Sequence, residues 1–297
     1  MEAAQGTSVG HALEVLIQPL WVGGVALVCL PATAVVLVRV RRWWDSGRPL
    51  PLPLDRAMPA VPWPPMAGFV LFAAMYALMW LMVMYWPSVS DRLGLAPDDA
   101  EAPVGVGVLL AMTVPALAGL AVVATYRRRG LQAVGLRLGS VRAGLAYGTV
   151  TAVAVFPLCV AGLILSGLVL QRLHVAPQQP ELLHTVESAR EAHVYWPMAM
   201  ALFQAAVLAP LAEEFMYRGV LFVSLMKEIG VGGAILGSSL LFALAHAPAQ
   251  PQSVLSLFVL GGALAYAAYR TRSLVASILT HAAFNTVMVL GTFFGGG

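Results

Sequence analysis

Five polar side chains in apolar segments of the last third of this sequence could carry out chemistry. The segment LAPLAEEFMYRGVLF contains Glu213 and Glu214, LLFALAHAP contains His246, and SILTHAAFNTV contains His281 and Asn285. An ionisable side chain deep in hydrocarbon costs about 2.5–3.5 kcal/mol on insertion scales, so each one indicates a function unless it has an apparent partner. Carboxylates and imidazoles are the groups that most often move protons in catalysis.

The spacing within each segment separates these residues by role. Glu214 and Arg218 are four residues apart on one helix face, with the acid first, which is the favourable order for an ion pair. Glu213 points about 100° away from Glu214 and is left free to face another element. His281 and Asn285 are also four residues apart, so both can address one point from one helix. Glu213 is therefore predicted to be catalytic, with Glu214 and Arg218 in support.

This set suits the hydrolysis of a peptide bond. Glu213 is the natural general base for water, and His246 can orient that water or bind a metal through a neutral ring nitrogen. His281 and Asn285 can stabilise the negative charge that develops on the carbonyl oxygen. Glu213, His246 and His281 could also hold zinc, but the usual pair of histidines four apart with a glutamate between them is absent. We therefore expect either no cofactor or zinc.

The elements that position these residues are predicted to be transmembrane helices. Of the 297 residues, 60% are hydrophobic and 10% are charged, against roughly 25% charged in a soluble domain. A helix needs about 20 apolar residues to cross a bilayer. The chain is therefore expected to be an all-α, polytopic membrane protein with about eight spans, at residues 16–38, 66–86, 104–125, 144–170, 195–225, 230–248, 253–269 and 273–294.

Charged residues between the predicted spans indicate a topology. Arginines follow the first and third spans and acidic residues follow the second and fourth, so the arginine-rich loops are expected on the cytoplasmic side. Lys227, Arg270 and Arg272 then also face the cytoplasm. Counting 1.5 Å per residue from that side, Glu213, His246 and His281 lie at similar depths, about 14 to 24 Å. The net charge of +3 reflects this topology and indicates no nucleic-acid partner.

The ordered motifs EEFMYR, FALAH and HAAFN resemble those of the CPBP family of intramembrane proteases, which includes the type II CAAX prenyl endopeptidases. The family pattern of EExxxR, FxxxH and HxxxN is met in full. It adds Phe242 to the supporting residues, although a phenylalanine beside His246 also suits core packing. The resemblance covers roughly residues 195–294. It implies a helical bundle with a cavity open to the cytoplasm and the lipid, and relatives have been described both as metalloproteases and as metal-free glutamate proteases.

These observations predict two regions and one main function. Residues 1–194 are expected to form about four N-terminal spans, and residues 195–297 a catalytic core of about four spans. The predicted protein is an intramembrane endopeptidase in the cell membrane, in a bacterium the inner membrane, with its active site open to the cytoplasm. Its partners are the lipid bilayer and a membrane-associated peptide or protein substrate, lipidated or not.

Two other functions fit the same residues. A proton- or ion-coupled transporter could use Glu213, Glu214 and the histidines as a relay, but transporters usually have two related halves and these residues all lie in the C-terminal half. A non-catalytic scaffold or immunity protein is the other alternative. Pro210, three residues before Glu213, removes a backbone hydrogen bond and either kinks the helix and admits water or is simply tolerated.

Overall fold

The computed structural model describes residues 61–94, 101–136, 141–175, 181–191 and 195–295, with six further residues between 31 and 45. This part of the chain is helical and contains no strand, which confirms the predicted all-α class. Its elements are α2 (Pro65–Arg92), α3 (Glu101–Ala124), α4 (Arg127–Ala133), α5 (Val141–Arg172), α6 (Glu181–Glu191), α7 (Tyr195–Phe203), η2 (Gln204–Leu208), α8 (Ala209–Glu214), η3 (Phe215–Leu221), α9 (Phe222–His246), η4 (Pro251–Ser253), α10 (Val254–Thr271) and α11 (Leu274–Gly295).

Six helical segments of the described residues are long and apolar enough to cross a membrane. They are Pro65–Arg92, Val106–Ala124, Val141–Arg172, Tyr195–His246, Pro251–Thr271 and Leu274–Phe294. The predicted count of about eight is not confirmed. The first predicted span, residues 16–38, lies almost entirely outside the described residues. The fifth predicted span and all but the last two residues of the sixth fall within the single 52-residue segment Tyr195–His246.

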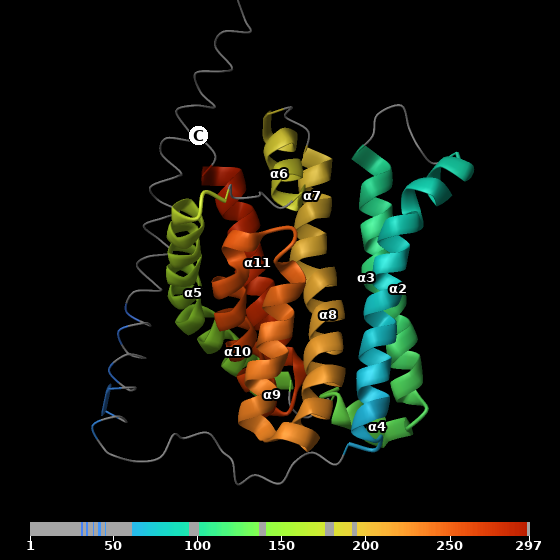
Figure 1. The fold of residues 1–297 in the computed structure, drawn as a ribbon, viewed down its shortest axis with the longest axis vertical. Helices are drawn as coiled ribbons and strands as arrows, with labels where there is room; N and C mark the ends of the chain where they lie inside the picture. Colours follow the sequence, from blue (N-terminus) through green and yellow to red (C-terminus); the bar gives the residue numbers. More distant parts are fainter. Residues whose placement is uncertain are drawn as a thin grey trace, which may run out of the picture.

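That 52-residue segment folds back on itself at Gly230. The backbone there has φ of 69° and ψ of 177°, a conformation that residues with a Cβ atom rarely adopt. The aromatic rings of Tyr217 and Phe242, one on each side of the turn, meet edge to face at 5.2 Å between centroids. The segment is therefore a helical hairpin, and in Figure 1 α9 runs beside α8.

Helix α10 lies at the centre of the bundle and packs against α5, α9 and α11. Small residues allow the close approach of α5 and α11: a Cβ atom added at Gly148 would lie 2.8 Å from the carbonyl oxygen of Ala276. The Thr280 hydroxyl donates a hydrogen bond of 3.0 Å to the Gly148 carbonyl at the same crossing. These contacts hold α11, which carries His281 and Asn285, against the other helices.

Helices α2 and α3 pack against each other and lie on the opposite side of the molecule from α5 (Figure 1). The start of α2 is attached to the hairpin beside its turn. Lys227 Nζ donates hydrogen bonds to the carbonyls of Val61 (2.9 Å) and Trp63 (2.7 Å). Trp63 Nε1 lies 3.4 Å from the Ser224 hydroxyl, and Gly68 passes close to that same serine. Farther along, α2 packs against η3 and α9.

Candidate active site

Glu213 and Glu214 lie at the end of the short helix α8, between two π-helical segments, η2 and η3. A π-helical turn carries an extra residue and changes the direction in which the following side chains point, and such turns are frequent at functional sites. The Glu214 side chain is fully buried, whereas the Glu213 side chain is 12% exposed. The two adjacent carboxylates therefore face different surroundings, as the sequence predicts.

Glu214 forms a buried ion pair with Arg218. Arg218 Nη1 lies 2.8 Å from Glu214 Oε1, and both side chains are fully buried. Arg218 Nη2 donates a further hydrogen bond of 3.2 Å to the carbonyl of Gly261 on α10. A side chain at Gly261 would crowd this guanidinium and Ser239, so the glycine allows α10 to come close. The predicted pairing is confirmed, and it links η3 to α10.

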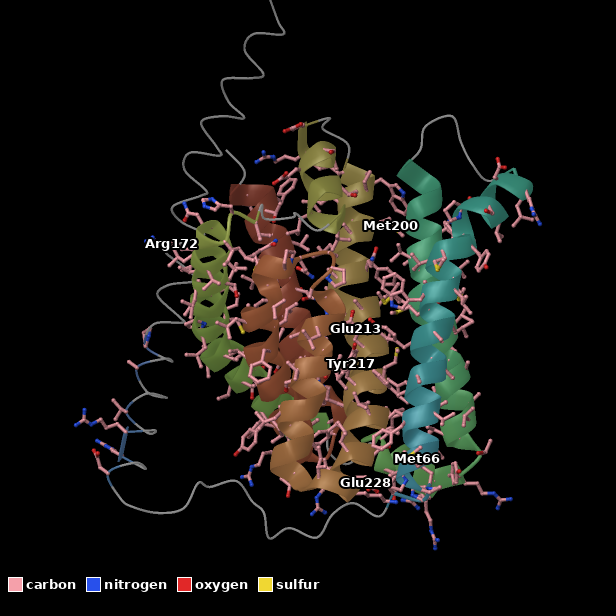
Figure 2. All side chains as sticks on the ribbon, in the orientation of Figure 1. Met66, Arg172, Met200, Glu213, Tyr217 and Glu228 are labelled. Carbon is pink, nitrogen blue, oxygen red and sulfur yellow. The ribbon has the colours of Figure 1, made fainter. Side chains whose placement is uncertain are left out.

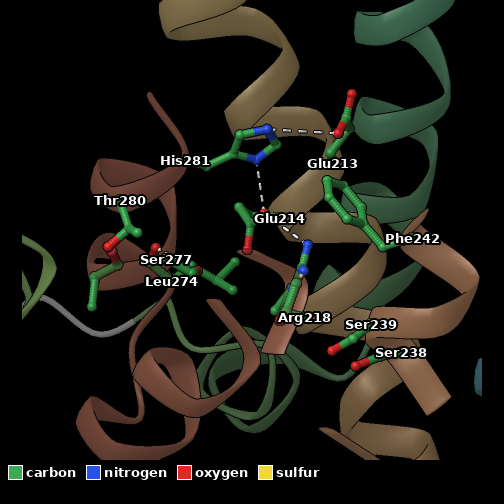
Figure 3. Close-up of polar contacts among 12 residues, drawn as sticks. Glu213, Glu214, Arg218, Ser238, Ser239, Phe242, Leu274, Ser277, Thr280 and His281 are labelled. Carbon is green, nitrogen blue, oxygen red and sulfur yellow. Dashed lines mark hydrogen bonds and ion pairs between the residues drawn. The ribbon is translucent and has the colours of Figure 1, made fainter. Parts of the chain in front are cut away.

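Glu214 also binds His281, a contact that the sequence does not reveal. The His281 Nδ1 atom lies 2.9 Å from Glu214 Oε1, the oxygen that also accepts from Arg218. The opposite ring nitrogen, Nε2, faces Glu213 Oε2 at 3.9 Å. Figure 3 shows the His281 ring between the two carboxylates. Glu214 thus holds both Arg218 and His281, and its supporting role is larger than that of an ion-pair partner.

His246 approaches Glu213 from the other arm of the hairpin. Its Nδ1 atom lies 2.8 Å from the carbonyl oxygen of Phe242, one turn earlier in α9. Its Nε2 atom faces Glu213 Oε2 at 3.9 Å, and its side chain is 25% exposed. Both imidazoles therefore direct Nε2 towards the same carboxylate oxygen. The structure brings together Glu213, His246 and His281, as the topology estimate predicts.

The Phe242 ring lies between the groups of the site. Its centroid is 4.8 Å from that of His246 and 5.6 Å from that of His281. The Arg218 guanidinium carbon lies 4.6 Å from the ring centroid, within the range of a cation–π contact. Phe242 is fully buried. It therefore belongs to the core, as the packing interpretation predicts, and it also fixes the positions of both imidazoles.

Asn285 contacts a different element from His281. Its Nδ2 atom donates a hydrogen bond of 2.9 Å to the carbonyl of Ala205 in η2. This carbonyl lies five residues before Pro210, whose missing N–H leaves a backbone acceptor of the preceding turn without its usual donor. Asn285 therefore stabilises the π-helical turn that precedes the Glu213 segment. That His281 and Asn285 address one substrate atom stays a prediction.

The fit of a zinc ion can be tested against the donor atoms. Zinc ligands lie at about 2.0–2.1 Å from the metal for nitrogen and about 2.0–2.2 Å for carboxylate oxygen. In the part of the chain that the structure describes, no group of three or more His, Cys, Asp or Glu residues could hold a metal ion. Glu213 Oε2 lies 3.9 Å from Nε2 of His246 and 3.9 Å from Nε2 of His281, and these are the atoms that would hold zinc. Metal dependence stays a prediction, and the steps below use the protein's own groups.

Tyr217 is a residue of the site that the sequence interpretation passes over. It lies in the first motif, four residues after Glu213, and its side chain is buried. Its ring contacts Phe242 on one side and Phe72 of α2 on the other, each at 5.2 Å between centroids. A four-residue spacing from Glu213, like that between His281 and Asn285, is the signal that could have identified it.

Comparison with known proteins covers the part of the chain that contains these residues. No curated protein and no solved structure matches the chain. A family model, described as Type II CAAX prenyl endopeptidase Rce1-like, matches residues 195–287. This range includes Glu213, Glu214, Arg218, Phe242, His246, His281 and Asn285. The resemblance to CAAX-type intramembrane proteases that the three motifs indicate is thus confirmed for residues 195–287, which form an Rce1-like region of the chain.

Proposed function

We propose that this protein is an intramembrane endopeptidase in which Glu213 and His246 activate a water molecule. The observation that carries the proposal is the convergence of Nε2 of His246 and Nε2 of His281 on Glu213 Oε2, each at 3.9 Å. Among the described residues this oxygen is buried and has no hydrogen-bond partner. A buried carboxylate oxygen without a donor is costly, so it needs a ligand that donates hydrogen.

The donors and acceptors of the surrounding side chains identify that ligand. A carbonyl only accepts, so His246 Nδ1 carries the hydrogen in its contact with Phe242. His281 Nδ1 likewise donates to the Glu214 carboxylate. In the neutral imidazoles both Nε2 atoms therefore have lone pairs directed at Glu213. Water supplies two hydrogens to such a group of acceptors, and its oxygen remains free to attack a carbonyl carbon.

The proposed reaction follows from this arrangement. Glu213 takes a proton from water while the water oxygen bonds to the carbonyl carbon, and the electrons of the carbonyl double bond move to its oxygen. When the tetrahedral intermediate collapses, the carbon–nitrogen bond breaks and Glu213 returns the proton to the leaving nitrogen. The products are a carboxylic acid and an amine. General acid–base catalysis of this kind contributes about 10²–10⁴-fold to the rate.

The negative charge on the carbonyl oxygen requires hydrogen-bond donors. We assign this role to His281 and Asn285. For this role His281 takes a proton from solvent on Nε2 before the attack and keeps it throughout the cycle, so the proton that Glu213 moves is unaffected. Glu214, which accepts from His281 Nδ1, stabilises this imidazolium. Asn285 has two hydrogens on Nδ2, and one of them is donated to Ala205. The second hydrogen is the one that we propose binds the oxyanion.

The substrate class and the location follow from the position of these groups in apolar helices. The segment Tyr195–His246, which carries Glu213 and His246, is one of the candidate membrane spans. We propose that the substrate is a membrane-associated peptide or protein, lipidated or not, and that the protein lies in the cell membrane. Three basic residues support access from the cytoplasmic side: Lys227 near the turn of the hairpin, Arg270 in the last turn of α10 and Arg272 directly after it.

The experiment compares variants of the full chain reconstituted in lipid vesicles with prenylated and unmodified membrane peptides, and new peptide termini are identified by mass spectrometry. Glu213→Gln and His246→Ala are expected to lower turnover at least about a hundredfold. Glu228→Gln and His174→Ala change exposed residues of the same types and serve as controls.

Full turnover by the Glu213→Gln protein would contradict the proposal. Proton flux without cleavage would instead favour a transporter. Metal analysis of the active protein, with activity measured before and after chelation, tests the metal-free mechanism separately. If chelation removes the activity and added zinc restores it, Glu213 is a zinc ligand and not the general base.

A further inference from the structure

The two arms of the hairpin that ends in His246 have unequal lengths. The turn at Gly230 divides the segment Tyr195–His246 so that the arm after it is the shorter one. At 1.5 Å per residue, α9 extends about 24 Å from Gly230 to His246, and α10 extends about 27 Å over its 18 residues. The hydrocarbon core of a bilayer is about 30 Å thick. Both helices are therefore slightly too short to cross it.

The connection between α9 and α10, residues 247–253, thus ends short of one membrane surface. Figure 1 shows it below the upper ends of α7 and α11. Tyr195 and Trp196 are exposed at the beginning of α7. Tyrosine and tryptophan concentrate at the level of the lipid headgroups, so these two residues mark the membrane surface above the connection. The connection therefore lies at membrane depth.

This connection is neither α-helical nor fully covered by protein. The N–H groups of Ala249 and Gln250 both donate to the carbonyl of His246, at 3.2 and 3.0 Å, and the 3₁₀ turn η4 follows. Pro248 and Ala249 are exposed, and Gln250 adds a polar side chain. At membrane depth, irregular backbone is stable only where protein buries it or where it lines a water-filled space. Because Pro248 and Ala249 are not buried, we expect water beside them.

The two groups proposed to activate water are themselves partly exposed. His246 is the last residue of α9, directly before the connection, and its side chain is 25% exposed, against 12% for Glu213. Figure 2 shows Glu213 between Met200, near the beginning of the longer arm, and Glu228 at the turn. Water beside residues 247–253 is therefore next to the imidazole that faces Glu213 Oε2.

We propose that residues 247–253 line the entrance through which the hydrolytic water reaches His246 and Glu213, from the end of the bundle opposite Lys227. The inference rests on the proposed protease function and gives the route of its second substrate. The peptide substrate approaches from the side of Lys227, as proposed above, so peptide and water arrive from opposite sides. A separate route keeps water available while the peptide covers the site.

The test measures how fast a water-soluble reagent reaches single cysteines in the full chain. Cys29 and Cys159 are replaced by alanine, and Pro248→Cys or Ala249→Cys is added. A positively charged methanethiosulfonate reacts with the ionised thiol, which forms only where water is present. Leu244→Cys is the matched control, because Leu244 is 50% exposed on an apolar face of α9. We expect the cysteines at 248 and 249 to react at least about tenfold faster than Leu244→Cys.

Vesicles of both orientations show from which side the reagent enters. Arg142 is exposed at the beginning of α5 and lies on the cytoplasmic side in the predicted topology, so Arg142→Cys reports access from that side. The reagent is expected to reach Ala249→Cys from the other side. Full modification of Ala249→Cys is expected to remove most of the cleavage activity, because the bound group occupies the entrance. Modified Arg142→Cys is expected to stay active.

The inference is wrong if the cysteines at 248 and 249 react no faster than Leu244→Cys, or if the reagent reaches Ala249→Cys only from the side of Arg142. It is also wrong if fully modified Ala249→Cys cleaves at its unmodified rate. If Glu213→Gln abolishes cleavage and one of these results is found, only the water entrance is wrong. Labelling does not depend on cleavage, so full turnover by Glu213→Gln would show separately that the protease mechanism is wrong.

Discussion

The helices from α7 to α11 and the α2–α3 pair bury different kinds of side chains. In their most apolar stretches, 44% of residues are buried in Pro251–Thr271 but only 11% in Pro65–Arg92. Among the described residues, every buried polar or charged side chain except Ser90 belongs to residues 214–281. The segments that carry Glu213, His246 and His281 are 33% buried, between these two values. The buried polar groups thus lie within the packed helices of the C-terminal part, and α2 presents mainly apolar side chains.

This difference indicates how the protein keeps charges inside a membrane. Glu214, Arg218 and His281 compensate one another through short contacts within one group. Such a group tolerates no change to one member alone, because the remaining charge stays buried. The α2–α3 side holds its position through apolar contacts and a few bonds at the beginning of α2, so single changes there should cost less.

The largest expected effect is in the buried ion pair. Arg218→Met keeps most of the side-chain volume but leaves Glu214 buried without its cation, so we expect a loss of about 3–5 kcal/mol in stability, measured by thermal unfolding in detergent. The double variant Glu214→Gln with Arg218→Met removes both charges and should recover part of this loss. Arg92→Met, at the end of α2, is the exposed control. If Arg218→Met melts at the same temperature as the unsubstituted protein, the helices from α7 to α11 are no more sensitive to single changes than the α2–α3 pair.

A smaller loss is expected where α5 crosses α11. A methyl group at Gly148 would lie 2.8 Å from the Ala276 carbonyl oxygen, so Gly148→Ala must push the helices apart, at a cost of about 1–3 kcal/mol. Gly167→Ala on the same helix meets no atom within 4 Å and should be neutral or slightly stabilising. Equal melting temperatures for the two variants would contradict the close packing described for the bundle.

The smallest effect is expected at the attachment of α2. Lys227→Met removes two hydrogen bonds to the backbone of residues 61–63 at the exposed end of the hairpin, and we expect a loss of about 1 kcal/mol. Hydrogen exchange should increase at the beginning of α2 and stay unchanged in α10. Increased exchange throughout α10 would mean that the two regions unfold together.

The sequence predicts the parts of this site that depend on spacing within one helix. The Glu214–Arg218 pair follows from a four-residue interval, and the common depth of Glu213, His246 and His281 follows from counting residues along each span. The bond between His281 and Glu214, and that between Asn285 and Ala205, depend on how α11 is rotated against α8 and η2. That rotation is set by close contacts such as Gly148 with Ala276 and by π-helical turns, which no single-helix pattern encodes.

The turn at Gly230 also bears on the order in which the site is assembled. Glu213 and His246 belong to the two arms of one hairpin, so a single short loop closure brings this carboxylate and imidazole together. His281 comes from α11, later in the chain, and joins them only when that helix docks. The proposed water-activating pair is thus local in sequence, while the contacts of His281 with Glu213 and Glu214 need the last helix.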